Sequence, residues 1–271
     1  MMKLKKTALI AALLMSMIGL AGCAQRNQQA DQWPTIQKRQ KIVVGIDDSF
    51  VPMTYREKNG QLTGFDVDLA RAIFKGSGIR VDFQSIDWDM KETELNNQTI
   101  DLIWSGYSKT AQRAKRVAFS DPYLTNRQMI VSLKKHPVNQ MADLTNQPLG
   151  VQTGSSGMEQ LERYPKRLQQ RIANHAPILY DTYNNAFIDL QADRIKGLLI
   201  DEVYAQFEIK SRHNGSDFQA IDSPFAAEQF AVGMRPQDQQ LRQFINRRYR
   251  VLQANSTLAK LKAKWFKEQD E

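Results

Sequence analysis

The sequence predicts an α/β fold with two lobes, each built on a sheet that is flanked by helices. Apolar, β-branched runs alternate with amphipathic helical patterns along most of the chain, which is typical of parallel sheets covered by helices. The alternation begins at residues 41–46 and starts again near residue 148, which indicates a second sheet. Open α/β sheets bind ligands at the carboxyl ends of their strands, so we expect the binding site in a cleft between the lobes.

Strand and helix patterns succeed each other in a regular order. In the first half we expect strands at residues 41–46, 80–86, 99–105 and 127–135, and helices at residues 64–78, 90–98 and 110–119. In the second half, the strand and helix patterns alternate again within the segments 149–164, 176–195, 196–212 and 217–236. Two basic amphipathic helices follow up to Trp265. These patterns contain no internal repeat and no low-complexity block.

The first 22 residues are typical of an export signal and are set aside from the fold. A basic start, MMKLKK, precedes an apolar run that is too short to span a bilayer. The following LAGC looks like a bacterial lipobox, which would make Cys23 the lipidated first residue of the mature chain. An ordinary cleaved signal with an incidental thiol is the alternative. Residues 23–37 would be the lipidated cysteine and a flexible tether, and the protein would be extracytoplasmic and lipid-anchored to the cell membrane.

Composition and charge narrow the class of protein further. The chain has 271 residues and a formal net charge of +8, and Cys23 is its single cysteine, so a disulfide framework is excluded. Removing Lys3, Lys5 and Lys6 with the signal leaves a net charge of +5. No known nucleic-acid-binding motif accompanies this charge, so we expect a solvated helical face and no nucleic-acid partner.

The segment WSGYSKTAQRAKR follows an apolar strand and contains the residue types of an anion site. Gly106 would let a ligand approach the backbone, the hydroxyls of Ser105 and Ser108 would donate hydrogen bonds, and a helix beginning at Thr110 would present unpaired N–H groups. Arg113 offers a planar fork that matches a carboxylate through two parallel bonds. Alternatively, Thr110 is only a helix cap and Arg113 a surface arginine.

Two features of the second half could face this site. Gly154, Ser155 and Ser156 lie between a strand and a helix, and Ser156 with Glu159 also fits a capping box. Asp201 follows an apolar strand, where it could hold an ammonium group or cap the next helix. An anion site in one lobe, donors in the other and an opposing carboxylate together indicate recognition of a zwitterion.

These segments resemble the bacterial extracellular solute-binding protein family 3, which includes amino-acid-binding lipoproteins of ABC importers. The matching sequences are GIDDSFVPMTYREKNGQLTGFDVDLARAI, DWDMKETELNNQTIDLIWSGYSKTAQRAKRVAFSDPY, DLTNQPLGVQTGSS and AFIDLQADRIKGLLIDEVYA, and the resemblance spans Lys41 to Trp265. It implies a type II periplasmic-binding-protein-like fold with two sheets and two hinge crossings, a monomer, no cofactor and no metal. The partners would be a small L-amino acid and the ABC permease and ATPase subunits.

The resemblance also implies which residues bind the ligand. They would be Asp47, Phe50, Trp88, Ser105, Gly106, Ser108, Arg113, Gly154, Ser155, Ser156 and Asp201. Ser108 and Arg113 would bind the α-carboxylate from the first lobe, Ser156 and neighbouring N–H groups would join them from the second, and Asp201 would take the α-ammonium. The two aromatic side chains would sandwich the ligand. Many members have an acidic residue before the arginine, where this chain has Gln112.

The family pattern implies a particular division of the chain. It would cross between the lobes near residues 130–134 and 219–224. Residues 38–131 and 223–271 would form the first lobe, and residues 132–222 the second.

The expected preference for one kind of ligand side chain depends on three of the implied pocket residues. Asp47 with Phe50 and Trp88 would suit a guanidinium or ammonium group stacked between aromatic rings, since cation–π contacts stabilise by about 0.5–2 kcal/mol. Asp47 could instead satisfy local backbone N–H groups, and Trp88 could simply cover the cleft. We expect a polar amino acid, with an arginine-like basic one as the leading candidate.

Two other functions fit an exported protein with two lobes. A secreted enzyme of the same fold, such as a dehydratase, would need a general acid or base in the cleft. His136, His175 and His213 all lie in polar contexts outside any motif, so we expect no enzyme. A surface adhesin could use the basic C-terminal helices, and this role is compatible with transport.

Overall fold

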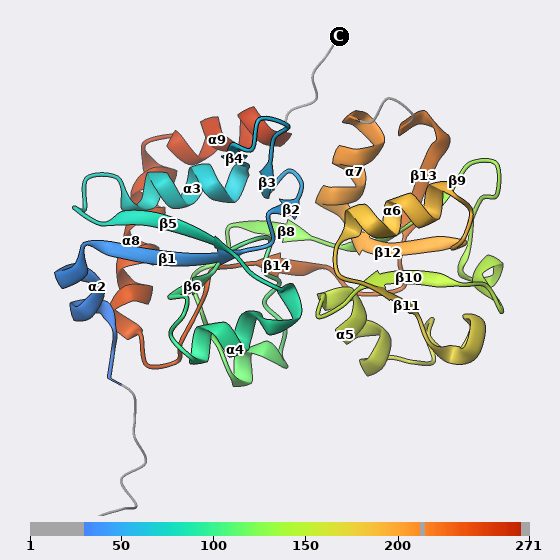
Figure 1. Cartoon of the computed structure of the whole chain (residues 1–271), viewed down its shortest axis with the longest axis horizontal. Coiled ribbons are helices and arrows are strands. Elements are labelled where there is room, and N and C mark those ends of the chain that lie inside the picture. The colour runs from blue at the N-terminus through green and yellow to red at the C-terminus, as the bar shows by residue number, and fades with distance from the viewer. Residues whose placement is uncertain (1–29, 212–214, 267–271) are drawn as a thin grey trace, which may run out of the picture. The chain divides into compact units, whose positions relative to one another are not determined.

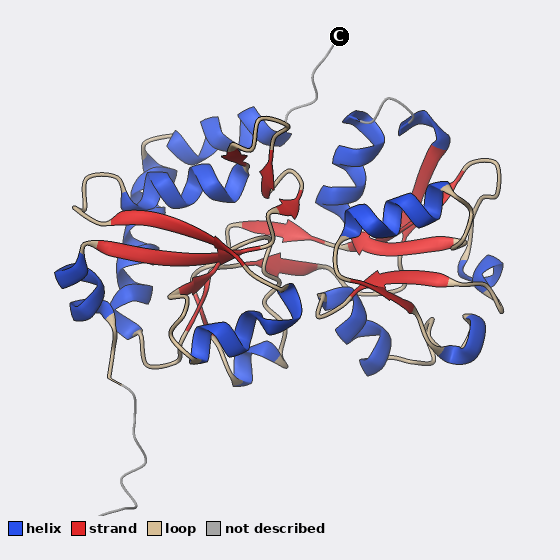
Figure 2. Ribbon diagram, in the orientation of Figure 1, coloured by secondary structure: helices blue, strands red, loops and turns tan. Residues whose placement is uncertain are grey.

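Two mixed five-stranded sheets, each flanked by helices, lie side by side in the computed structural model (Figures 1 and 2). The structure describes residues 30–211 and 215–266, and from Asp31 onward they belong to one compact unit. The expected export signal and Cys23 lie outside the described residues. The expected fold class, two helix-flanked α/β sheets, is confirmed.

The first sheet has the strand order β5-β1-β6-β15-β7. Its strands are β1 (Lys41–Ile46), β5 (Arg80–Ser85), β6 (Leu102–Ile103), β7 (Ala118–Phe119) and β15 (Gly233–Met234). The helices around it are α2 (Trp33–Arg39), α3 (Phe65–Phe74), α4 (Lys91–Asn96), α8 (Gln239–Ala254) and α9 (Thr257–Phe266). β1 runs parallel to β5 and β6, whereas β15 runs antiparallel to β6 and β7. We call this sheet and its helices the first lobe.

The second sheet has the strand order β11-β10-β12-β9-β13. Its strands are β9 (Gln128–Leu133), β10 (Leu149–Gln152), β11 (Ile178–Tyr180), β12 (Gly197–Asp201) and β13 (Phe218–Asp222). Its helices are α5 (Ser156–Arg163), α6 (Tyr183–Gln191) and α7 (Glu202–Ser211). β10 is parallel to β11 and β12, and β9 is antiparallel to β12 and β13. This sheet and its helices form the second lobe.

Shorter elements connect and decorate the lobes. The antiparallel pair β8 (Leu124–Asn126) and β14 (Glu228–Phe230) lies between the two sheets in Figure 1. A three-stranded ribbon consists of β2 (Ser49–Phe50), β3 (Thr54–Arg56) and β4 (Leu62–Thr63). The 3₁₀ helices are η2 (Trp88–Met90), η3 (Arg113–Lys115), η4 (Met141–Leu144), η5 (Ala173–His175) and η6 (Gly215–Asp217).

The sheets are mixed, where the alternating pattern predicts parallel ones. The chain enters the second lobe through β9 and returns to the first through β14 and β15, and the returning strands run opposite to their neighbours. The crossings also differ from the expected ones. All of β9 pairs within the second sheet, so the first crossing precedes residue 128, and the expected boundary between residues 131 and 132 falls inside this strand. The second crossing lies between β13 and β15, within residues 223–232.

The expected flexible tether is wrong for its last residues, because Trp33–Arg39 is helix α2. Pro34 in the first turn supplies a backbone angle suited to a helix start, and Gln40 ends the helix in the left-handed conformation. Trp33 and Ile36 are buried, and the Trp33 ring lies 4.6 Å from the ring of Phe244 on α8. Folded structure therefore begins before the first strand.

The expected helix at residues 110–119 is also wrong. The chain makes only the short η3 helix and enters β7 at Ala118, so it has no room for a regular α-helix. Thr110 still caps this turn, since its hydroxyl accepts a hydrogen bond from the Arg113 backbone N–H at 3.1 Å.

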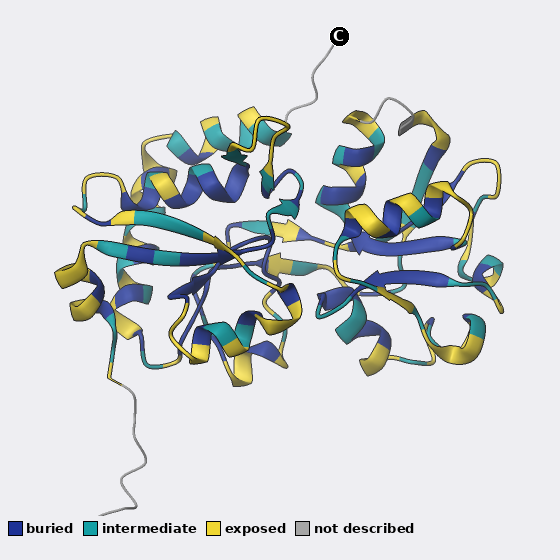
Figure 3. Cartoon of the chain, in the orientation of Figure 1, coloured by how far each residue is buried: buried dark blue, intermediate teal, exposed yellow. Residues whose placement is uncertain are grey.

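The inner strands of both sheets are largely buried, whereas the edge strands β5 and β11 are more exposed, and the helices bury the face that packs on the sheets (Figure 3). The carboxyl ends of β1 and β6 in the first lobe and of β10 and β12 in the second converge on the space between the sheets. In the described ranges no helix is long and apolar enough to cross a membrane.

Candidate functional site

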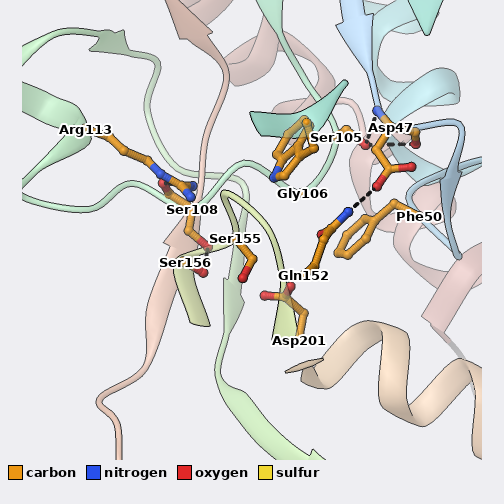
Figure 4. A pocket seen from close by; sticks show the side chains of 11 residues that line it. Asp47, Phe50, Ser105, Gly106, Ser108, Arg113, Gln152, Ser155, Ser156 and Asp201 are labelled. Atoms are coloured by element: carbon orange, nitrogen blue, oxygen red, sulfur yellow. Dashed lines mark hydrogen bonds between the residues drawn. The ribbon is translucent and has the colours of Figure 1, made fainter. Parts of the chain in front are cut away.

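A small cavity of about 10 Å³ lies between the lobes, at the carboxyl ends of these four strands (Figure 4). It is lined by Asp47, Phe50, Trp88, Ser105, Gly106, Ser108, Arg113, Gln152, Ser155, Ser156 and Asp201. Most of these side chains are polar, and each is buried in the closed arrangement of the lobes. The cavity is therefore a polar, enclosed site to which both lobes contribute.

Arg113 is the cation of the cavity wall, and its side chain is 1% exposed. Its Nη1 donates to the Ser108 carbonyl at 3.1 Å, its Nη2 to the Gly154 carbonyl at 3.1 Å, and its Nε to Glu159 Oε1 at 2.5 Å. The guanidinium also lies 4.7 Å from the centre of the Tyr107 ring. Three of its five N–H donors are thus paired within the described chain, and the other two have no partner there. The surface alternative for this arginine is wrong.

Hydroxyl groups from both lobes meet beside Arg113, as Figure 4 shows for Ser108 and Ser156. Ser156 Oγ donates to Ser108 Oγ at 3.1 Å and accepts from Gln128 Nε2 at 3.2 Å. The expected capping box of Ser156 and Glu159 is wrong, because Ser155 is the N-cap of α5 and accepts from the Met158 backbone N–H. Ser156 is consequently free to face the first lobe.

Gly106 brings the backbone close to the cavity. Its φ of +54° lies in the left-handed region, and a Cβ at this position would come within 2.4 Å of the Phe50 ring. Its N–H donates to Asp66 Oδ2 at 2.7 Å, and Tyr123 donates its hydroxyl to the same oxygen at 2.9 Å. Burial raises the pKa of Asp66 to about 7. Asp66 fixes the orientation of this peptide from behind the cavity.

Asp201 is the last residue of β12 and is buried at the cavity wall. Asn126 and Gln128 donate to its Oδ1 at 2.5 and 2.8 Å, and Tyr183 donates to its Oδ2 at 3.0 Å. Burial, together with repulsion from the Glu228 carboxylate, raises the pKa of Asp201 to about 7. A cation bound here would favour the ionised carboxylate.

Asp47 lies at another part of the cavity, in contact with Gln152 of the second lobe (Figure 4). Gln152 Nε2 donates to Asp47 Oδ2 at 2.8 Å, and the Ser49 N–H and hydroxyl donate to Oδ1 at 2.9 and 2.6 Å. Burial raises the pKa of Asp47, although these donors oppose the shift. Asp47 thus satisfies local donors, as one of the two alternatives expects, and it also lines the cavity.

The aromatic residues of the cavity wall are anchored by other rings. Phe50 packs against Tyr183 and Tyr204 of the second lobe, with ring centres 5.9 and 5.6 Å apart. Trp88 meets the Tyr107 ring edge-on at 5.9 Å and is 7% exposed. Trp88 and Phe50 therefore have little freedom to move away from a ligand while the cleft is closed.

Ten of the eleven expected ligand-binding residues surround this cavity. The eleventh, Gly154, does not line it, but its carbonyl accepts the Arg113 bond. Gln152 is a further lining residue beyond the expected ones, and its position at the end of β10, which matches that of Asp201 at the end of β12, could have identified it. Lys91 and Glu159, which make contacts between the lobes, are likewise not among the expected residues. In residues 30–211 and 215–266, no cluster of acidic residues, histidine and cysteine could hold a metal ion.

The fold and the site define a binding protein with two lobes, whose enclosed polar cavity has Arg113 in one part of its wall and Asp47 and Asp201 in others. The sequence model of the bacterial extracellular solute-binding proteins, family 3, matches residues 42–268. The chain belongs to this family, and the resemblance seen in the sequence is confirmed.

Similar proteins of known role include amino-acid-binding proteins. The arginine-binding extracellular protein ArtP of Bacillus subtilis (strain 168) is 28% identical over 267 residues, which cover 97% of this chain and 98% of that protein. A substrate-binding protein of an ABC uptake transporter from Streptococcus pneumoniae, solved with bound histidine, is 42% identical. Its TM-score is 0.84, and the match covers 87% of this chain and 96% of that one.

A third similar structure is the ancestral amino-acid-binding protein AncCDT-1, a precursor of cyclohexadienyl dehydratase. It is 29% identical with a TM-score of 0.75, and the match covers 86% of this chain and 99% of that one. The family and these relatives are binding proteins.

Proposed function

We propose that this protein is the substrate-binding component of an ABC amino-acid importer and captures a polar L-amino acid, with arginine and histidine as the leading candidates. The observation that carries the proposal is that a buried arginine and a buried aspartate both line one enclosed cavity. An α-amino acid presents a carboxylate and an ammonium group on the same carbon atom. Arg113 would bind the first group and Asp201 the second.

The carboxylate end of the site has more donors than Arg113 alone. The two unpaired N–H groups of its guanidinium, the hydroxyls of Ser108 and Ser156 and the N–H groups near the start of α5 would surround the two carboxylate oxygens. Each charge-assisted hydrogen bond contributes about 1.5–3 kcal/mol. Asp66 would assist by holding the Gly106 backbone in place.

The side chain of the ligand would extend towards Asp47 and Gln152. The Asp47 carboxylate would attract a guanidinium or imidazolium group, and Phe50 and Trp88 would offer ring faces to it. The relatives that bind arginine or histidine support a basic side chain. Gln152 adds an amide that could also serve a neutral polar side chain, so the class proposed is polar with a basic preference.

Closure of the two lobes would supply the affinity. Micromolar binding needs about −8 kcal/mol, and an amino acid has only about ten heavy atoms, so each atom must contribute about 0.8 kcal/mol, well above the value of drug-sized ligands. An exposed surface site would lose much of this energy to solvent. Enclosure between the lobes removes water from the charged pairs, and the closed form would then deliver the ligand to the membrane permease.

We further propose that the protein acts as a monomer without a cofactor and is attached to the membrane through a lipid on Cys23. We also propose that it is no enzyme. The Asp201 carboxylate has the raised pKa of a general acid, but three donors hold it, which suits a fixed counter-ion better than a proton shuttle.

A thermal-shift screen against the twenty standard L-amino acids tests the proposal. A ligand at 100 times its dissociation constant stabilises by about 2.7 kcal/mol, which raises the Tm of a chain of this size by about 5–10 °C. We expect such a shift with L-arginine, L-histidine or both, and none with their D-enantiomers. If all twenty leave the Tm unchanged, the proposed function is wrong.

A further inference from the structure

Glu159 reaches from the second lobe to the carboxylate-binding arginine of the first. It lies in the first turn of α5, and its Oε1 accepts from Arg113 Nε at 2.5 Å. Its Oε2 accepts from the Thr110 hydroxyl at 2.8 Å. Both carboxylate oxygens thus bind groups of the segment 110–113 in the first lobe, although Glu159 belongs to helix α5 of the second. These bonds join the two lobes in the closed arrangement.

Glu159 approaches the guanidinium from the side opposite to the cavity. It is absent from the cavity wall and instead lines the outer groove between the lobes, together with Gln112 and Glu162. Arg113 itself does line the cavity. The guanidinium therefore separates two carboxylate positions, one filled by Glu159 outside and one inside for a ligand.

The balance of charge at this point supports the same arrangement. Lys91 of the first lobe donates to the Gly154 carbonyl at 2.9 Å, beside the Arg113 bond to the same oxygen at 3.1 Å. Lys91 and Arg113 are both buried, with 4% and 1% exposure. Burial and the nearby Arg113 charge lower the pKa of Lys91 to about 7. The carboxylates of Glu92, Glu159 and Asp89 all act on Lys91, and Glu159 also binds Arg113, so Glu159 links the two buried basic side chains.

We infer that Glu159 is the positioning residue that completes the α-carboxylate site when the cleft closes. By holding Nε and the Thr110 hydroxyl, it fixes the plane of the guanidinium so that the unpaired N–H groups face the ligand. This inference rests on the proposed function, since it concerns the same amino-acid site. It adds that ligand binding and the Arg113–Glu159 ion pair stabilise each other through closure.

The test compares Glu159→Gln with Glu162→Gln, a matched control on the exposed face of the same helix. The probes are L-histidine and L-arginine and their carboxamides, which lack the α-carboxylate charge. Calorimetry gives the affinities, and stopped-flow tryptophan fluorescence gives the dissociation rates. We expect Glu159→Gln to bind both amino acids about tenfold to a hundredfold more weakly, mainly through faster dissociation, with Glu162→Gln unchanged.

Carboxamide binding separates positioning from a general loss of structure. The wild type should prefer each amino acid over its carboxamide, and Glu159→Gln should lose most of that preference. A purely structural defect would weaken the binding of each amino acid and of its carboxamide equally, and this result would overturn the inference. Unchanged or tighter binding by Glu159→Gln would overturn it too, because Glu159 would then be a bystander or a competitor of the ligand. If the wild type binds neither amino acid, the proposed function fails instead, and this inference with it.

Discussion

Buried carboxylates determine the chemistry of the cleft at the scale of single residues. Asp201 accepts three hydrogen bonds and still has a pKa raised to about 7, because it is removed from water and lies near Glu228. The ammonium group of the proposed ligand would favour the ionised form of this carboxylate. Sequence patterns could place Asp201 at the end of a strand, but they could not show its surrounding donors, which come from β8, β9 and α6.

The raised pKa predicts how binding depends on pH. A bound α-ammonium group would lower the pKa of Asp201, so the complex would hold fewer protons than the free protein below about pH 7. Affinity for L-arginine should therefore fall as the pH decreases from 7 to 5, by up to about tenfold per pH unit. Calorimetry across this range should show the decrease in the wild type and a smaller one in Asp201→Asn.

The exposed Asp222 provides a control for this measurement. Asp222→Asn should retain the pH dependence of the wild type. If Asp201→Asn binds L-arginine as tightly as the wild type at pH 8, the ammonium-binding role of this carboxylate is contradicted.

At the scale of elements, the sequence predicts the long strands and helices well and the short ones poorly. β1, α3, β5 and β9 lie within the expected ranges, and β1, α3 and β9 bury most of their apolar residues, whereas the edge strand β5 buries none of its residues fully. The expectations for η3 and α2 are wrong for opposite reasons, since a helix is expected where the chain forms only η3, and a tether where it forms α2. The first is cut short by the chain entering β7, and the second is a polar segment with only two buried anchors, Trp33 and Ile36.

Helix α2 offers a direct test of where the fold begins. Trp33→Ala would remove a buried ring that packs on Phe244, and it should lower the free energy of unfolding by about 3 kcal/mol. Urea denaturation measures this loss, and the exposed Thr35→Ala serves as the control in the same helix. A midpoint unchanged in Trp33→Ala would mean that residues 33–39 behave as a tether after all. Ligand affinity should not change, since α2 contributes nothing to the cavity wall.

In the whole molecule, the site forms where the strand ends of the two sheets meet between the lobes. The residues of the cavity come from strand ends far apart in the sequence, and their types could be predicted because carboxyl ends of parallel strands meet at one edge. The contacts across the cleft, such as Asp47 with Gln152 and Arg113 with Glu159, could not be predicted. They depend on how the lobes close, and local patterns carry no information about that packing.

In the proposed function, Arg113 holds the carboxylate of an amino acid between the closed lobes. Calorimetric titration of Arg113→Ala with L-arginine and L-histidine measures this role, with the exposed Arg116→Ala as the matched control. We predict that Arg113→Ala loses affinity at least about a hundredfold while its circular dichroism stays that of the wild type, that Arg113→Lys recovers only part, and that Arg116→Ala binds normally. Undiminished binding by a folded Arg113→Ala protein would contradict the account.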